Sequence, residues 1–270
     1  MTEALRSCVH THTTFCDGAS TPEETVRAAL ALGFVSLGFS GHGAAAYDDA
    51  AMRPEAEVQY RREILRLRAA YAGQLELLLG QEHDALSPYA DYPYDYLIES
   101  VHYLRHQGDL LCVDLSRADT EAHIRRFGDP YAYCRAYFET CAAAYEKSPA
   151  NIAGHLDLVS KFNGAGDLFN EADPRYLGPA REALAVAVER GLAVEVNTGA
   201  MARGYRPIPY PAPALLRTLR ELGGRVILTS DCHNAAQLIY GYAEALALLR
   251  AEGFRTALVL RASGFRETAL

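Results

Sequence analysis

Short apolar segments alternate with helical segments along almost the whole chain, and this alternation restricts the folds it can adopt. Seven segments are interpreted as buried strands: residues 8–13, 35–40, 75–82, 95–103, 152–158, 192–198 and 225–230. A helical segment or a long loop follows each one. Parallel strands need such crossovers, and helices then cover both faces of the sheet. The pattern therefore predicts an α/β fold with a parallel sheet, and residues 257–260 are expected to add an extra strand.

Helices are expected between these strands, and one has a clear start. Thr21 is predicted to be its N-cap, with Pro22 in the first position and Glu24 completing a capping box. Further helices are predicted over residues 55–71, 131–146, 176–190 and 214–222, with a last one ending at residue 249. Residues 105–129 are polar and are expected to form a long loop with a short helix.

Polar side chains gather where the predicted strands end. These side chains are His10, His12, His42, Glu82, His102, His155, Asp231 and His233. In a barrel of parallel strands, the carboxyl ends of the strands meet at one face, where active sites lie. No linker or repeat divides the 270 residues. We therefore predict a distorted seven-stranded, TIM-like (β/α) barrel that forms a single domain over residues 1–270.

The spacing of the polar residues indicates metal binding. Residues two apart on a strand point the same way, so His10 and His12 share a face, as do Asp231 and His233. Each pair alone is more often fortuitous than functional. Six of the nine histidines lie at strand ends, however, and the set predicts a common site. Histidine and carboxylate ligands suit zinc, iron or manganese.

These motifs, taken in order, resemble a known family. The segment 8–18, which holds His10, His12 and Asp17, resembles the first motif of the polymerase and histidinol phosphatase (PHP) superfamily. Its later motifs are matched by Phe-Ser-Gly-His42, Gly-Gln-Glu82, Ser-Val-His102, Gly-His155-Leu-Asp and Ser-Asp231-Cys-His233. Residues 94–103 and 195–205 are similar to the histidinol-phosphatase branch in particular.

The resemblance implies a site with three divalent metal ions, zinc, iron or manganese. The implied ligands form three groups: His10, His12, Glu82 and Asp231; Glu82 again, as a bridge, with His102 and His155; and Asp17, His42 and His233. Glu82, Asp231 and His233 are the expected catalytic residues. Many members have Asp where this chain has Gly41, so a carboxylate that would orient His42 is missing here.

The implied reaction is the hydrolysis of L-histidinol phosphate to L-histidinol and phosphate in histidine biosynthesis, by attack of a metal-bridging hydroxide. Arg203 and Lys161 lie just beyond strand ends and are the candidates for contacting the substrate. The alternative is a hydrolase of the same superfamily that acts on another small phosphomonoester or a nucleotide. A non-catalytic metal-binding protein is disfavoured because all nine ligand positions hold the expected residue types.

Composition restricts the partners of the chain. The formal net charge of −8 argues against a protein that grips nucleic acid with a basic face. No secretory signal is recognised, and no apolar run approaches the roughly 18 residues that span a bilayer. The six cysteines form no Cys-x-x-Cys pair. We therefore expect a cytoplasmic enzyme with reduced thiols, a small phosphomonoester as its partner, and no nucleic-acid or membrane partner.

Overall fold

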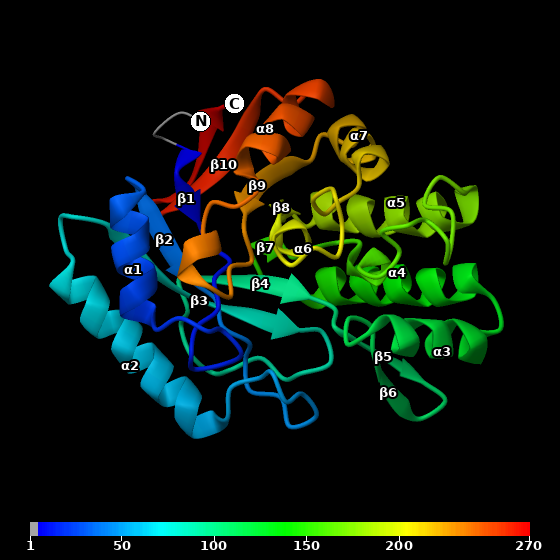
Figure 1. Cartoon of the computed structure of the whole chain (residues 1–270), viewed down its shortest axis with the longest axis horizontal. Coiled ribbons are helices and arrows are strands. Elements are labelled where there is room, and N and C mark those ends of the chain that lie inside the picture. Colours follow the sequence, from blue (N-terminus) through cyan, green and yellow to red (C-terminus); the bar gives the residue numbers. More distant parts are fainter. Residues whose placement is uncertain (1–4) are drawn as a thin grey trace.

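The computed structural model describes residues 5–270. Residues 1–4 lie outside the described residues; both the predicted domain and the segment searched for a secretory signal begin there. A single curled sheet of nine strands runs through the fold (Figure 1). In sheet order the strands are β1 (Ser7–Cys8), β2 (Ser36–Phe39), β3 (Glu76–Asp84), β4 (Tyr96–Ser100), β7 (Ile152–Ala153), β8 (Ala193–Asn197), β9 (Arg225–Thr229), β10 (Thr256–Arg261) and β11 (Gly264–Ala269). Neighbours from β1 to β10 are parallel, and β11 is antiparallel to β10.

Helices surround the sheet (Figure 1). They are α1 (Pro22–Ala31), α2 (Pro54–Ala70), α3 (Arg117–Phe127), α4 (Pro130–Lys147), α5 (Pro174–Glu189), α6 (Gly199–Ala202), α7 (Pro213–Glu221) and α8 (Tyr242–Ala251). The predicted capping box of α1 is confirmed: Glu24 N donates to Thr21 Oγ1 at 3.3 Å, and Thr21 N donates to Glu24 Oε2 at 2.7 Å. Among residues 5–270, no helix is both long enough and apolar enough to cross a bilayer.

The sheet closes on itself through its first and seventh barrel strands. His12 N donates to Cys232 O at 2.8 Å, and Cys232 N donates to His10 O at 3.2 Å, so the ends of β1 and β9 are joined. The strands β1, β2, β3, β4, β7, β8 and β9 therefore form the predicted seven-stranded distorted barrel. The predicted extra strand is confirmed as β10, which continues the sheet beyond β9.

Apolar side chains pack on both sides of the barrel wall. One cluster lies under α1 and α2 against β2 and β3, and a larger one lies between the sheet and α4, α5, α7 and α8. A third fills the barrel interior and includes Val9, Tyr96 and Ile227. A Cβ on Gly38 would come within 2.3 Å of the Tyr96 hydroxyl, and one on Gly80 within 2.3 Å of the Tyr96 ring, so only glycine leaves room for this side chain. The interior below the strand ends is therefore apolar.

Two predicted strands are shorter than expected, and near the end of each a backbone amide donates to a side chain. The predicted strand 8–13 reduces to β1, and Thr11 N donates to Ser40 Oγ at 3.2 Å. The predicted strand 152–158 reduces to β7, and His155 N donates to Glu195 Oε2 at 2.8 Å instead of to a neighbouring strand. In both places the chain leaves the regular sheet where the polar cluster begins.

The prediction of a long loop over residues 105–129 is wrong, but the short helix predicted within this segment is confirmed as α3. Strands β5 (Tyr103–His106) and β6 (Asp109–Cys112) form an antiparallel hairpin, and α3 covers 11 residues after it. Gln107 and Gly108 both have positive φ, 52° and 90°, as the tight two-residue hairpin turn requires. Strand β11 was also not predicted; all six of its residues are exposed or half-buried, so it lacks the apolar alternation of a half-buried strand.

Candidate metal centre

The polar strand ends converge at the carboxyl face of the barrel, as predicted. In four groups, ligand atoms lie within 4.8 Å of one another: His12, Asp17, His42 and His233; His10, His12 and Asp231; His10, Glu82 and His155; and His42, Glu82 and His102. All nine residues that the sequence singled out as metal ligands occur in these groups. The groups share members, so they form one continuous cluster.

Glu82 lies at the centre of the cluster, and its side chain is 1% exposed. Its Oε1 accepts a hydrogen bond from Ser100 at 2.7 Å and lies 2.9 Å from His155 Nε2 and 3.3 Å from His102 Nε2. Its Oε2 lies 3.1 to 3.3 Å from three other imidazole nitrogens: His10 Nε2, His12 Nε2 and His42 Nδ1. The two oxygens thus face different histidines, as a carboxylate that bridges two ions would.

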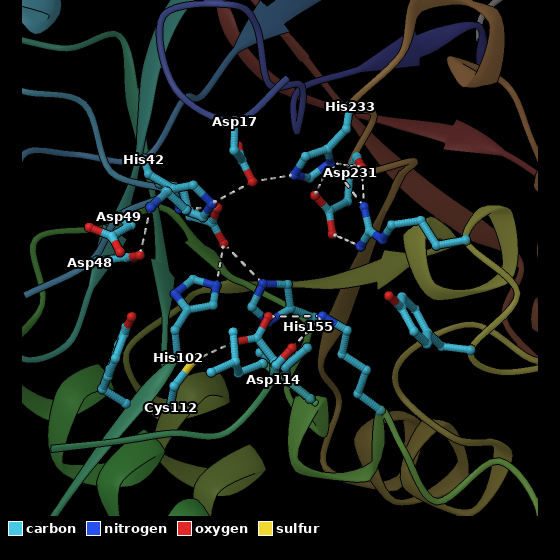
Figure 2. Close-up of a pocket in the computed structure, with 18 of the residues that line it drawn as sticks. Asp17, His42, Asp48, Asp49, His102, Cys112, Asp114, His155, Asp231 and His233 are labelled. Atoms are coloured by element: carbon cyan, nitrogen blue, oxygen red, sulfur yellow. Dashed lines mark hydrogen bonds and ion pairs between the residues drawn. The ribbon is translucent and has the colours of Figure 1, made fainter. Parts of the chain in front are cut away.

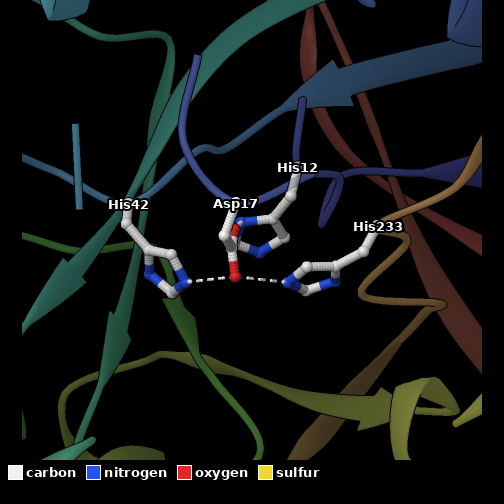
Figure 3. Close-up of side chains that lie close together, drawn as sticks. All are labelled: His12, Asp17, His42 and His233. Carbon is white, nitrogen blue, oxygen red and sulfur yellow. Dashed lines mark hydrogen bonds and ion pairs between the residues drawn. The ribbon is translucent and has the colours of Figure 1, made fainter. Parts of the chain in front are cut away.

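Asp17 lies at the outer edge of the cluster, between two imidazoles (Figure 3). Its Oδ2 is 3.1 Å from His233 Nε2 and 3.9 Å from His42 Nε2, and its Oδ1 is 3.3 Å from His12 Nδ1. The Asp17 side chain is 32% exposed and that of His233 is 24% exposed. This outer group is therefore open to solvent, whereas Glu82 is enclosed.

Asp231 connects the histidine cluster to an arginine. Its Oδ1 lies 3.3 Å from His12 Nε2 and 3.6 Å from His10 Nε2, and its Oδ2 accepts a hydrogen bond from Arg203 Nη2 at 2.9 Å. The backbone of Asp231 has a φ of 48°, which is uncommon for a residue other than glycine. A Cβ on Gly199 would come within 2.8 Å of both side chains, so Gly199 makes room for this contact.

The buried histidines and carboxylates of the cluster shift one another's pKa values strongly, and the carboxylates favour the binding of cations. Burial opposes protonation of His10, but Glu195, Glu82 and Asp231 outweigh it and hold the pKa of His10 well above its ordinary value. Burial likewise opposes ionisation of Glu82, yet the surrounding histidines hold its pKa well below the ordinary value. Burial lowers the pKa of His42 to about 4, so this imidazole is neutral and able to bind a metal.

The donor set fits divalent cations. Among the described residues, the buried Oε2 of Glu82 has no hydrogen-bond partner. Buried polar atoms are nearly always paired, so an orphaned carboxylate oxygen that faces three imidazole nitrogens fits a position where a cation can bind. Imidazole and carboxylate ligands suit zinc, iron and manganese. The arrangement can therefore hold metal ions that activate water and bind an anionic substrate.

Two buried carboxylates that support the histidines were not predicted as site residues. Asp84 Oδ2 accepts a hydrogen bond from His102 N at 2.9 Å and lies 3.4 Å from His102 Nδ1. Glu195 Oε1 lies 2.5 Å from His10 Nδ1. Strand alternation offered a clue to Asp84, which stands two residues after Glu82 on β3 and therefore faces the same side.

A cavity of about 400 Å³ adjoins the cluster (Figure 2). Both predicted substrate-contacting residues, Arg203 and Lys161, line it. Lys161 Nζ donates to the backbone oxygen of Asp114 at 2.8 Å and to its Oδ2 at 3.0 Å. Asp48 and Asp49 lie on the side of the cavity next to His42. The cavity thus combines cationic and anionic side chains beside the metal-ligand cluster.

Two buried polar residues of β3 and β4, His83 and Glu99, pair with each other outside the cluster. His83 Nδ1 lies 3.2 Å from Glu99 Oε1, and His83 Nε2 lies 3.0 Å from Ser87 O. Glu99 also accepts hydrogen bonds from Ser148 at 2.6 Å and from Tyr89 at 2.9 Å. This buried group anchors the loop after β3 and contacts none of the predicted ligands through these bonds.

Comparison with known proteins decides the family. The model of the PHP domain matches residues 9–199. The chain belongs to the PHP domain family. A probable histidinol-phosphatase of Deinococcus radiodurans is 34% identical, covering 92% of this chain and 94% of that protein. The histidinol-phosphatase of Bacillus subtilis is 27% identical, covering 86% of this chain and 95% of that protein.

Solved structures of this PHP-type fold are similar to the chain. The putative histidinol phosphatase of Listeria monocytogenes superposes with a TM-score of 0.79, at 23% identity, over 88% of this chain and 99% of that one. The histidinol phosphate phosphatase of Lactococcus lactis, solved with zinc, L-histidinol and phosphate, has a TM-score of 0.72 at 19% identity, over 97% of this chain and 99% of that one. These likenesses confirm the predicted barrel.

Proposed function

We propose that this PHP-family protein is a metal-dependent phosphatase that hydrolyses L-histidinol phosphate to L-histidinol and phosphate. The observation that carries the chemistry is the convergence of nine histidine and carboxylate side chains in one cluster, with Glu82 at its centre. The substrate follows from the relatives at 34% and 27% identity, whose names are probable histidinol-phosphatase and histidinol-phosphatase. Both relatives align with most of this chain, so the proposal covers the face of the barrel where the strand ends carry the proposed ligands.

The centre is proposed to hold three divalent ions, zinc, iron or manganese. The resemblance implies one ion between His10, His12, Glu82 and Asp231, a second between Glu82, His102 and His155, and a third at Asp17, His42 and His233. The structure brings the same nine residues together but combines them differently, since Glu82 groups with His10 and His155 and also with His42 and His102. Bound ions of this kind lower the pKa of water and neutralise phosphate oxygens. The bridging position of Glu82, with its two oxygens facing different histidines, supports more than one ion.

The chain's own residues are proposed to bind and orient the substrate. Arg203 and Lys161 would contact the phosphate from the cavity wall. Glu82, Asp231 and His233 are the proposed catalytic residues: Glu82 and Asp231 would hold the ligand cluster together, and His233 would contact the substrate from the outer end of the cluster. The position of His233 supports this role, because its side chain is 24% exposed and borders the cavity.

The acidic side of the cavity favours histidinol phosphate over a nucleotide. Asp48 and Asp49 line the wall near His42, and Asp114 lies beside Lys161. Their carboxylates would attract the protonated amine of histidinol, whereas a nucleotide carries no cationic group at neutral pH. The single domain over residues 1–270, the cytoplasmic location and the absence of nucleic-acid and membrane partners stay predictions.

The decisive experiment is an assay of phosphate release with protein of known metal content. L-histidinol phosphate is compared with a phosphomonoester that lacks an amine, a nucleoside monophosphate and a phosphodiester, and Asp231→Ala protein serves as the blank. A kcat/KM for histidinol phosphate of about 10⁴ M⁻¹s⁻¹ or more, far above the others, is expected. Equal and weak hydrolysis of every monoester would retain the chemistry and reject the substrate.

A further inference from the structure

Glu195 in β8 is a fully buried carboxylate next to the proposed metal centre, yet it belongs to none of the ligand groups. Four groups surround its two oxygens. Oε1 lies 2.5 Å from His10 Nδ1 and accepts a hydrogen bond from Thr229 at 2.7 Å. Oε2 accepts hydrogen bonds from Asn197 Nδ2 at 3.0 Å and from His155 N at 2.8 Å. Both oxygens are therefore saturated without a metal, which separates Glu195 from Glu82.

The contact with His10 determines which nitrogen of that imidazole can bind a metal. A neutral imidazole carries one proton, and an adjacent carboxylate holds that proton on the nitrogen nearest to it. With Nδ1 protonated toward Glu195, the lone pair of His10 is on Nε2. That nitrogen lies 3.1 Å from Glu82 Oε2 and 3.6 Å from Asp231 Oδ1, in the middle of the ligand cluster.

The contact with His155 acts on the backbone. Strand β7 ends at Ala153, and the amide of His155 bonds to Glu195 instead of to a neighbouring strand. This bond holds the chain where it leaves the sheet. The His155 side chain then reaches the other oxygen of Glu82, with Nε2 2.9 Å from Oε1. One carboxylate thus orients ligands on both sides of Glu82.

We propose that Glu195 is a positioning residue that sets the tautomer of His10 and the place of His155, so that the inner ions depend on it. The inner ions are those expected beside Glu82, His10 and His155. The outer group of Asp17, His42 and His233 has no contact with Glu195, so its ion is expected to bind without it. The inference rests on the metal centre proposed above.

The test compares two buried glutamates of the same barrel, Glu195 in β8 and Glu99 in β4. Glu195→Gln removes the charge that holds the His10 proton. Glu99→Gln is the matched control, since Glu99 is equally buried and also pairs with a histidine, His83, away from the cluster. Each protein is stripped with a chelator and titrated with Zn²⁺ against a chromophoric chelator, and the visible spectrum is recorded after loading with Co²⁺. Thermal unfolding of the stripped proteins reports any loss of folding.

We expect Glu195→Gln to bind part of its zinc 10- to 100-fold more weakly, the usual effect of losing a carboxylate that orients a histidine ligand, and to change the Co²⁺ spectrum. Glu99→Gln is expected to keep the wild-type affinity and spectrum, even if its stripped form unfolds at a lower temperature. Wild-type zinc affinity and spectrum in Glu195→Gln would overturn the inference. Failure of the wild-type protein to bind any of Zn²⁺, Mn²⁺ and Fe²⁺ would instead overturn the proposed function.

A second measurement needs no variant. In zinc-loaded wild-type protein, ¹⁵N NMR of the imidazoles distinguishes a protonated nitrogen from a metal-bound one. His10 is expected to carry its proton on Nδ1 and to bind through Nε2. A His10 that binds zinc through Nδ1, or that has no proton on Nδ1, would overturn the inference even if Glu195→Gln does not fold.

Discussion

The guanidinium of Arg203 lies against the carboxylate of Asp231, with Nη2 2.9 Å from Oδ2. Its Nη1 donates to Asp231 O at 3.1 Å and lies 2.9 Å from His233 Nδ1. The same side chain borders the cavity. Arg203 therefore joins two proposed metal ligands to the space where the phosphate would bind, and its loss should affect both.

Substitution Arg203→Ala is expected to lower kcat/KM about 100-fold, the usual effect of losing one donor that stabilises developing negative charge. Arg203→Lys should recover only part of this, because an ammonium cannot make two parallel contacts. The measurement is kcat, KM and inhibition by inorganic phosphate. Arg217→Gln is the control, since Arg217 pairs with Glu252 outside the site. An unchanged phosphate inhibition constant in Arg203→Ala would contradict the phosphate contact.

Substitution Asp231→Ala is expected to lower phosphate release by at least about 100-fold. This is more than the typical loss when a carboxylate that only orients a metal-binding histidine is removed. The variant removes a carboxylate near His10 and His12 and leaves the half-buried Arg203 without its partner. Steady-state assays with metal analysis report the effect. Activity at the wild-type level in a folded Asp231→Ala protein would show that the ligand assignment is wrong.

Substitution Lys161→Met is expected to raise KM about 10-fold with a smaller change in kcat, because a contact to the bound phosphate acts in the ground state as well. The chain offers a matched control in Lys147, its only other lysine, which is exposed at the end of α4. Initial rates over a range of substrate concentrations separate the two constants. Equal KM values for Lys161→Met and Lys147→Met would exclude Lys161 from substrate binding.

Stability should depend on acid pH through Asp114. Burial opposes its ionisation, but Lys161 and then His102 outweigh it and lower its pKa to about 2. The unfolded value is about 3.9. Folding therefore favours the ionised carboxylate of Asp114, which stabilises the folded protein. This stabilisation is complete above about pH 4 and is lost as pH falls through 2.

The expected size of the Asp114 effect is about 1–2 kcal/mol, because its side chain is 24% exposed and partly screened. The free energies of urea unfolding of wild-type and Asp114→Asn proteins, both stripped of metal, should therefore differ at pH 7, and the difference should shrink below about pH 4 and be lost as pH falls through 2. A difference in the free energy of unfolding that stays constant over this range would contradict the pKa assignment.

Metal removal should abolish activity and lower the unfolding temperature. The stripped cluster leaves the carboxylates Asp17, Glu82 and Asp231 with no counter-charge other than protons and Arg203. An ion that binds only the folded state adds about 4 kcal/mol of stability at 1,000 times its Kd. Calorimetry before and after reloading with Zn²⁺, Mn²⁺ or Fe²⁺ measures this gain. Full activity after complete metal removal would rule out the proposed mechanism.

Local chemistry in the sequence predicted most of the fold. The capping box at Thr21 predicted the start of α1, since both of its hydrogen bonds lie within four residues. The hairpin of β5 and β6 was missed because its turn, Gln107-Gly108, lacks the Asn or Asp usual at such turns. The positions of these strands depend on packing beside α3 and α4, which no local pattern records.

The sequence by itself determined which residue types stand at the strand ends. Strand period and βα alternation then required His10, Glu82 and Asp231 to face one end of the barrel. Only the tertiary structure decided which atoms meet. Glu195 and Glu99 are both buried strand glutamates, yet Glu195 orients His10, 185 residues away in the chain, and Glu99 pairs with His83. The physical reason is that alternation selects a face, whereas contacts across the barrel depend on strand register and on the curl that closes the sheet.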